Sequence, residues 1–170
     1  MGSPIRVSFQ YSEHDYVRAM RLHYASVLRL KLDIVVIVVV ASLGVYELQT
    51  PDSRWYGIVS LSLSAVLALL LVAAFWVIPV LAFRREPKFR DEYSLTFSPE
   101  GIHFHTAHID SQIQWSLYSR ALVDAYSYVL YYGTRSFSVV PTRVFENADQ
   151  RAAFDRLLSE KIPKIIRKGT

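Results

Sequence analysis

Three closely spaced histidines, His103, His105 and His108, are the side chains of this sequence that are best suited to chemistry. Their spacing is that of a His-x-His-x-Asp-His metal site, but Ala107 stands where the aspartate would be. On a strand, His103 and His105 would share one face, where a zinc ion could join them with His108 or Asp110. The favoured alternative is that their apolar neighbours are buried and the imidazole rings face water.

A second candidate group is basic and follows a long apolar run. It consists of Arg84, Arg85, Lys88 and Arg90. A basic cluster of about this size beside a membrane span attracts anionic lipid headgroups. Three acidic residues dilute it, and the favoured interpretation is that the cluster only orients the span. Three further arginines could add a phosphate-binding face: Arg135, Arg143 and Arg151.

Composition and the lack of other motifs argue against several classes of function. The chain has no cysteine, which excludes disulfides, thiolate metal sites and cysteine nucleophiles. It has no Gly-rich phosphate loop, nucleophile elbow or paired-carboxylate motif. Its 19 basic and 15 acidic residues give a net charge of +4, which is too small and too scattered for a nucleic-acid-binding protein. We therefore expect a non-enzymatic protein with no cofactor and no nucleic-acid partner.

The long apolar run predicts a transmembrane helix. Trp55 to Phe83 comprises 29 residues without a charge, whereas a span needs about 20. Such a helix exceeds the thickness of the hydrocarbon core, so it should tilt or project beyond it. Pro79, which has no backbone N–H, predicts a kink near its far end.

A shorter apolar run before it predicts a second span. Residues 32–48 are apolar except for a few positions, among them Asp33 and Glu47 near the ends. The alternative is a buried β-strand, because β-branched runs of this kind fill parallel sheets. A helical hairpin with a turn in the polar connector accounts for both runs. Small residues of the second span, Gly57 among them, should then pack on Gly44 of the first.

Basic residues near the span ends predict the orientation of this hairpin. Those that precede the first span are Arg18, Arg21, Arg29 and Lys31, and the basic cluster at residues 84–90 follows the second. The connector has only Arg54. Because basic residues stay on the cytosolic side, both termini should be cytosolic.

The segments on either side of the hairpin predict folded structure. Residues 5–11 alternate apolar and polar side chains, as a half-buried strand does. Ser12 predicts the N-cap of a helix that runs into the first span. After the second span, short alternating strands predict antiparallel β structure, in which Gly101 could take a positive φ in a turn and residues 122–133 form one strand. Asn147 predicts the start of a final helix. At least half of four clustered tyrosines should lie in the core: Tyr126, Tyr128, Tyr131 and Tyr132.

The order of these segments resembles a known family. A pair of membrane helices is followed by YSLTFSPEGIHF, then IQW, then VVPTRVFENADQRAAFDRLL. This succession resembles the YcxB-like family of bacterial membrane proteins over most of the chain. The resemblance implies a carboxy-terminal domain of the pleckstrin-homology-like (PH-like) type, a bent β-barrel closed by a helix, with Trp115 buried and a largely undefined molecular activity. Thr142 departs from a basic residue expected before Arg143, so no ligand contact is carried over there.

These observations together predict an α+β membrane protein with three parts. Residues 1–31 form a cytosolic strand and amphipathic helix, residues 32–83 form the transmembrane hairpin with spans at 32–48 and 55–83, and residues 84–170 form a cytosolic PH-like β domain with a carboxy-terminal helix. The amino-terminal strand should join that domain.

The expected location is the bacterial inner membrane. There the domain would bind a protein partner or a lipid headgroup, or associate with itself, in a regulatory, scaffolding or immunity-like role. One alternative is an accessory subunit of a membrane transporter complex. The other is a metal-dependent membrane enzyme that uses His103, His105 and His108.

Overall fold

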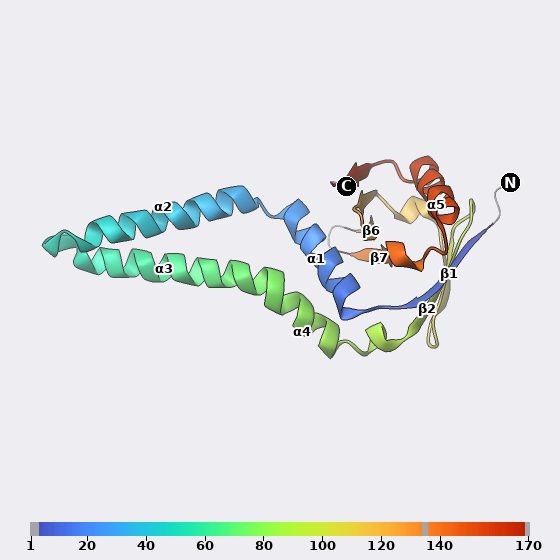
Figure 1. The fold of residues 1–170 in the computed structure, drawn as a ribbon, viewed down its shortest axis with the longest axis horizontal. Coiled ribbons are helices and arrows are strands. Elements are labelled where there is room, and N and C mark those ends of the chain that lie inside the picture. Colours follow the sequence, from blue (N-terminus) through green and yellow to red (C-terminus); the bar gives the residue numbers. More distant parts are fainter. Residues whose placement is uncertain (1–3, 134–135, 169–170) are drawn as a thin grey trace. The chain divides into compact units, whose positions relative to one another are not determined.

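The computed structural model describes residues 4–133 and 136–168, and the chain divides into two compact units. The strand unit combines Met1–Ala19 with Phe83–Thr170, and the helical unit is Met20–Ala82. Figure 1 shows the order of the elements along the chain. The architecture is α+β, as the sequence predicted.

The strand unit contains two four-stranded sheets. In the first, β1 (Ile5–Gln10), β2 (Glu92–Phe97), β3 (Ile102–His105) and β4 (Asp110–Ile113) are antiparallel in the order β1-β2-β3-β4. The second has the order β7-β6-β5-β8 and contains β5 (Arg120–Val123), β6 (Ser127–Tyr131), β7 (Phe137–Pro141) and β8 (Ile165–Arg167). The short β8 runs parallel to β5, and the sequence pattern did not predict it.

The strand that the alternating residues predicted near the amino terminus is confirmed as β1. Ile5, Val7 and Phe9 are buried, while the polar residues between them are exposed. β1 pairs with β2 in antiparallel register, with Val7 opposite Leu95. A strand from the amino terminus therefore completes a sheet whose other strands follow the apolar helices in the chain.

One helix fills the space between the sheets. α5 (Ala148–Lys161) starts at Asn147, whose side chain accepts a hydrogen bond from the backbone N–H of Gln150 at 2.8 Å. Its Phe154 is fully buried, with ring centroids 4.5 Å from Phe97 of β2 and 5.0 Å from Tyr128 of β6. Because Phe154 contacts both sheets, the two sheets and α5 share one hydrophobic core.

Trp115 also belongs to this core. It lies in the short 3₁₀ turn η4 (Trp115–Leu117) between β4 and β5, and it is 5% exposed. Its indole Nε1 donates to the carbonyl of Ser98 at 2.7 Å, which satisfies the one polar group of the buried ring. Its burial is what the family resemblance implied.

Two local predictions in the strand unit were wrong. Residues 122–133 are not one strand, because the Asp124 carboxylate accepts from the backbone N–H groups of Tyr126 and Ser127 and turns the chain between β5 and β6. Gly101 does not have a positive φ. A Cβ atom there would lie 2.6 Å from the carbonyl oxygen of Ile113, so glycine is needed for the close approach of two backbones.

The first of the long helices begins in the strand unit, and the others follow through the helical unit. They are α1 (Glu13–Val27), α2 (Leu30–Leu48), the 3₁₀ turn η1 (Pro51–Ser53), α3 (Arg54–Val72), the π-helical turn η2 (Ala73–Val77) and α4 (Ile78–Arg85). The strand alternative for residues 34–43 is wrong, since α2 is helical throughout. The predicted continuity with the preceding helix is also wrong. The chain leaves helical geometry at Arg29, where φ is −87° and ψ is 58°.

Two glycines hold α2 and α3 close together. A Cβ atom on Gly57 would lie 2.8 Å from the carbonyl oxygen of Gly44, and one on Gly44 would lie 2.9 Å from Cγ of Leu61. The predicted contact between Gly44 and Gly57 is confirmed. Only residues without a side chain allow the backbones of two helices to approach in this way.

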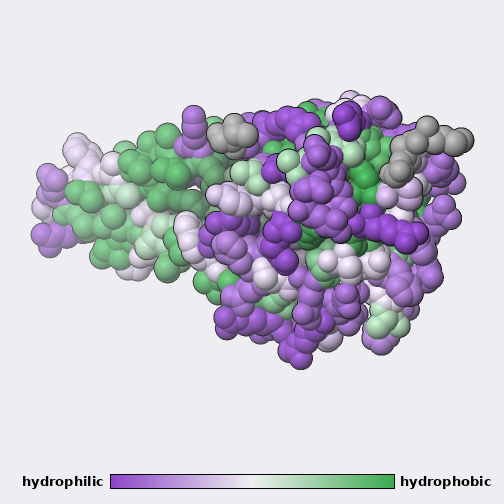
Figure 2. Space-filling view, turned by 45° about the vertical axis from the view of Figure 1, so that its right-hand side comes forward, coloured by the Kyte–Doolittle hydropathy of each residue, from purple (hydrophilic) through white to green (hydrophobic). Residues whose placement is uncertain are grey.

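The outer surface of the helical hairpin, α2 with α3, is apolar. Figure 2 shows green, hydrophobic surface over these helices. Leu69 is 68% exposed and Trp55 is 70% exposed. Contiguous apolar surface of this extent is unusual for a protein in water and is typical of a membrane or a protein interface.

Within the described residues, one continuous helical stretch is long and apolar enough to cross a membrane, Pro51–Arg85. Its 35 residues correspond to about 52 Å, against a hydrocarbon core of about 30 Å. The 19-residue helix α2 carries too many charges to count as such a helix. Any 18 consecutive residues of it include three charged side chains, those of Lys31, Asp33 and Glu47.

The bend near Pro79 has a specific cause. In a regular α-helix the carbonyl of Phe75 accepts from the N–H of residue 79, but proline has none. Arg21 of α1 supplies a donor instead, since its Nε lies 3.1 Å from the Phe75 oxygen and its guanidinium lies 5.4 Å from the centre of the Trp76 ring. The π-helical turn η2 comes immediately before, and the ribbon changes direction there (Figure 1).

Candidate functional site at the junction of strands and helices

The candidate site begins where β1 passes into α1. The Ser12 hydroxyl accepts from the backbone N–H of Asp15 at 3.1 Å, and the Asp15 carboxylate accepts from the backbone N–H of Ser12 at 3.1 Å. This reciprocal pair satisfies two N–H groups that a helix start leaves without partners. The predicted cap at Ser12 is confirmed, and it fixes the Asp15 side chain in the first turn of the helix.

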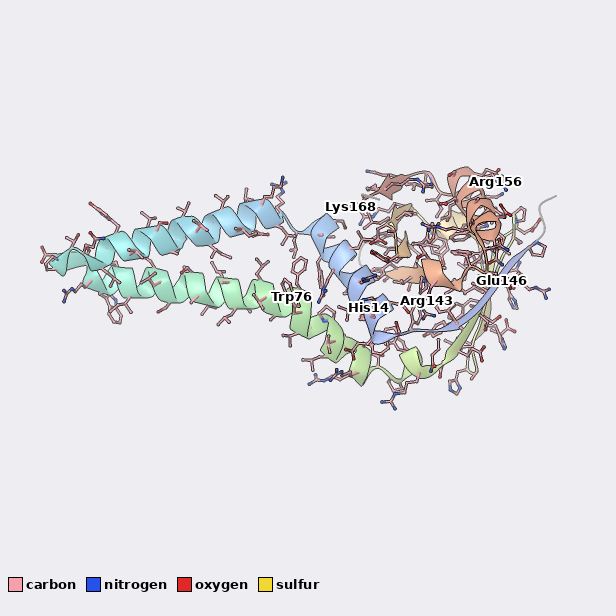
Figure 3. All side chains as sticks on the ribbon, viewed as in Figure 1. His14, Trp76, Arg143, Glu146, Arg156 and Lys168 are labelled. Atoms are coloured by element: carbon pink, nitrogen blue, oxygen red, sulfur yellow. The ribbon has the colours of Figure 1, made fainter. Side chains whose placement is uncertain are left out.

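Arg143 binds the same carboxylate from the other end of the chain. It lies in the 3₁₀ turn η5 (Thr142–Val144), and its Nε donates to Asp15 at 3.0 Å while its Nη2 donates to the carbonyl of Gln10 at 2.9 Å. Figure 3 shows its position. Burial alone would raise the pKa of Asp15, but hydrogen bonds from Arg143 and Ser12 outweigh it and lower the pKa. Asp15 is therefore ionised at neutral pH and holds Arg143.

Tyr11 joins the two sheets beside this ion pair. Its hydroxyl donates to the carbonyl of Val139, so it connects the end of β1 to β7, and each of these is an edge strand of its own sheet. Burial raises the pKa of the Tyr11 phenol. Its ring contacts Tyr93 and Phe89 edge-on, at centroid distances of 4.8 and 5.8 Å.

The predicted basic cluster lies at the end of α4 and in the 3₁₀ turn η3 (Pro87–Arg90), and half of it is paired. Arg84 donates to Glu13 of α1 at 2.9 Å, and Lys88 lies 3.3 Å from Glu86. The hydrogen bond from Arg84 lowers the pKa of Glu13. Arg85 and Arg90 are exposed and have no ion pair within the part of the chain that the structure describes.

Aromatic rings reinforce the pairing of Arg84 with Glu13. The ring of Phe89 stacks on Phe83 at 5.1 Å and lies 4.5 Å from Tyr16. Phe83 lies in the last turn of α4, and Tyr16 lies in the first turn of α1. The chain segments that lead into and out of the helical unit are therefore fastened to each other within the strand unit. We call this set of contacts the junction: Tyr11, Glu13, Asp15, Tyr16, Phe83, Arg84, Phe89 and Arg143.

The histidines lie away from the junction, on the hairpin of β3 and β4. His103 Nε2 is 2.6 Å from one oxygen of Asp110, and His105 Nδ1 is 3.4 Å from the other. The hydrogen bond from His103 lowers the pKa of Asp110. His108 is in the turn between the strands, where its backbone N–H donates to Thr106. Across residues 4–133 and 136–168, no three His, Cys, Asp or Glu side chains gather in a way that could hold a metal ion.

The remaining candidate side chains divide between the core and the surface. Tyr128 and Tyr131 are buried, whereas Tyr126 and Tyr132 are exposed, so the prediction that at least half lie in the core is confirmed. Arg151 donates to the hydroxyl of Tyr128 at 3.1 Å. With Arg143 on Asp15 and Arg135 outside the described residues, a phosphate-binding face of these three arginines gains no support.

A groove of about 210 Å³ lies beside α5, at the ends of β1 and β2. Its floor is apolar and includes Ile5, Phe97 and Leu157, and two opposite charges, Arg156 and Glu160, line it. The sequence pattern did not reveal this groove, because its residues come from three separate segments of the chain. The junction was partly foreseeable from Ser12 and Asp15, which stand three residues apart before a helix.

One comparison with known proteins gave a match, and it covers part of the strand unit. The strand unit is an α+β domain in which one helix fills the space between two antiparallel or mixed sheets. Residues 97–158, from the end of β2 into α5, match the family model described as YcxB-like protein. The family that the sequence resembled is thus confirmed over this segment. Comparison with curated proteins and with solved structures gave no match.

Proposed function

We propose that this chain is a non-enzymatic protein of the bacterial inner membrane, in which a two-span hairpin carries a cytosolic PH-like domain that binds a protein partner. The observation that carries the proposal is the combination of an apolar helical stretch, Pro51–Arg85, with a junction that gathers both ends of the helical unit into one domain. Such an arrangement suits a binding module tethered to a membrane.

The first span of the hairpin in this proposal is α2. Its charged residues lie near its ends, where they can reach the headgroup layer. Glu47 also accepts a hydrogen bond from Ser60 of α3 at 3.1 Å, which reduces the cost of moving it from water. Because β1 pairs with β2, the chain must return to the side from which it entered, and two spans satisfy this requirement.

The proposed orientation puts the strand unit in the cytosol. Most basic residues near the spans lie in the segments that connect them to the strand unit. The turn between the spans has only Arg54. The PH-like assignment is supported by two sheets that share a core with one carboxy-terminal helix, as the family resemblance implies. No catalytic step is part of the proposal.

A protein partner is favoured over a lipid headgroup by the side chains that remain available. Arg84 and Lys88 already pair with carboxylates, which leaves two unpaired cations in the basic cluster. The groove beside α5 combines an apolar floor with Arg156 and Glu160, a mixture typical of protein interfaces.

Topology is tested by cysteine labelling in intact cells, since the chain has no cysteine of its own. Asp52→Cys, in the turn between the spans, should react with an impermeant thiol reagent from outside. Glu160→Cys should react only after the cells are opened. Equal labelling of both variants in intact cells, or the reverse order, would contradict the proposed topology.

Binding at the groove is tested by photocrosslinking in living cells. A photoreactive residue in place of Arg156 should give a discrete adduct, which Ala153→Glu in the groove should weaken. The matched control is the same photoreactive residue at Glu146, which is exposed but does not line the groove (Figure 3). Adducts of the same size and intensity from both positions, or none from Arg156, would count against a protein partner there.

A further inference from the structure

The helical hairpin contains a crevice that the proposed tether does not explain. It has a volume of about 330 Å³ and lies between α2 and α3 at the end away from the Pro51–Ser53 turn. Its lining is apolar except for one carboxylate: Leu28, Asp33, Val36, Ile37, Leu67, Leu70, Leu71 and Ala74. An apolar crevice between two membrane helices is a site that a hydrocarbon chain can fill.

Asp33 makes this crevice chemically specific. Among the described residues, its carboxylate has no hydrogen-bond or ion-pair partner. The other acidic residue of the hairpin, Glu47, bonds to Ser60. An ionised carboxylate beside an apolar crevice at a membrane boundary is costly unless a cation or hydrogen-bond donor neutralises it. A ligand could therefore supply the cation or hydrogen-bond donor that the Asp33 carboxylate lacks.

A cation, Arg29, stands immediately before α2. The backbone carbonyl of Arg29 accepts from the N–H of Asp33 at 3.0 Å, and the Arg29 side chain is exposed and forms no ion pair within the described chain. The crevice thus combines a hydrocarbon slot with the Asp33 anion, and the Arg29 cation stands four residues earlier in the chain. A phospholipid with an amino headgroup has the complementary set of acyl chain, ammonium and phosphate.

We propose that this crevice binds phosphatidylethanolamine, with an acyl chain between α2 and α3, the ammonium group on Asp33 and the phosphate near Arg29. The inference rests on the proposed membrane location and adds a specific lipid ligand to it. Phosphatidylglycerol has the same acyl chains and phosphate but no ammonium group. It should therefore lack the charge-assisted contact with Asp33.

The test uses the full chain in detergent and native mass spectrometry with phosphatidylethanolamine and phosphatidylglycerol of identical acyl chains. The wild-type protein should bind phosphatidylethanolamine about tenfold more tightly, as expected for one charge-assisted contact. Asp33→Asn should abolish this preference and leave phosphatidylglycerol binding unchanged. Glu47→Gln, which removes the other hairpin carboxylate, should preserve the preference.

A second pair of variants tests the acyl-chain slot. Leu71→Trp should fill the crevice and weaken binding of both lipids, whereas Leu69→Trp, two residues away and not part of the lining, should not. Circular dichroism of each variant establishes that it is folded. Equal affinity of the wild-type protein for the two lipids, or an Asp33→Asn variant that keeps the preference, would overturn the proposal. A wrong membrane topology would instead appear in the cysteine labelling at Asp52, so the two failures are distinguishable.

Discussion

At the scale of single residues, the arginines are used mainly to hold the protein together. Arg143 holds the start of α1, Arg84 pairs with the same helix, and Arg151 binds a core tyrosine. A guanidinium on a long side chain reaches partners that are distant in sequence, as Arg143 reaches Asp15. These three arginines are therefore engaged within the protein, unlike Arg29, Arg85 and Arg90, which form no ion pair among the described residues.

The two junction arginines should differ in their effect on stability. Arg143→Gln should lower the free energy of unfolding by about 1 kcal/mol at pH 7, a modest value because the guanidinium is half exposed. Arg84→Gln should change it little, because both partners of that pair face water. Thermal unfolding in detergent, followed by circular dichroism, measures the difference. A larger loss for Arg84→Gln would contradict this ranking.

Stability should also depend on pH through Asp15. Its pKa is lowered in the folded state, so its contribution is present above the pKa of the unfolded chain, about 3.9, and is lost as the pH falls towards the folded value. The wild-type protein should lose more stability than Arg143→Gln between pH 5 and pH 2, since the variant has already lost the pairing. Parallel pH profiles of the two proteins would contradict this assignment.

At the scale of elements, the bend before α4 is a local defect that another helix repairs. Pro79 leaves the Phe75 carbonyl without its helical donor, and Arg21 supplies one. The pattern of apolar residues predicted the helix and its proline, but the donor comes from a residue 54 positions earlier in the chain.

A double-mutant cycle tests this repair. Arg21→Leu should cost about 1 kcal/mol in the natural background, because a partly buried carbonyl loses its donor. The cost should be smaller beside Pro79→Ala, whose N–H restores the helical hydrogen bond. Lys31→Leu, at an exposed helix position, serves as the control. Strictly additive effects of Arg21→Leu and Pro79→Ala would show that the two residues are not coupled.

At the scale of the whole molecule, the strand unit is assembled from two distant parts of the chain. β1 contributes Ile5, Val7 and Phe9 to the same core as residues of β2, β6 and α5. Each such buried side chain contributes about 1.5–3 kcal/mol relative to an exposed one. The segment after the apolar helices is therefore incomplete without the amino terminus.

A fused chain tests this composite domain. Residues 1–19 joined to residues 83–170 by a Gly/Ser linker of about 20 residues, which spans roughly 25 Å, should fold in water without the helical unit. Residues 83–170 alone should not fold cooperatively, because β2 loses its partner and the core loses the apolar side chains of β1. Amide dispersion in NMR spectra and cooperative thermal unfolding distinguish the two. Equal stability of the two proteins would contradict the composite unit.

Much of the secondary structure was predictable from the sequence because it depends on local periodicity, and the family match over residues 97–158 was predictable from the succession of motifs. The alternation of Ile5, Val7 and Phe9 predicted β1, the charge-free run from Trp55 predicted the apolar helix, and Asn147 predicted the start of α5. The turn at Asp124 was missed, since a side chain that bonds to its own backbone leaves no periodic signal. The same holds for β8, whose three residues are too few to form a pattern.

The sequence by itself determined the alternation of β1, the position of a charge-free apolar run of 29 residues and which side chains carry charge. Only the tertiary structure decided how those charges are used. It joined Arg143 to Asp15 and Arg21 to the Phe75 carbonyl, placed His103 and His105 against Asp110, and left Asp33 facing an apolar crevice. The physical reason is that hydrogen bonds and ion pairs depend on distances between segments far apart in the chain, whereas periodicity records only what each segment does alone.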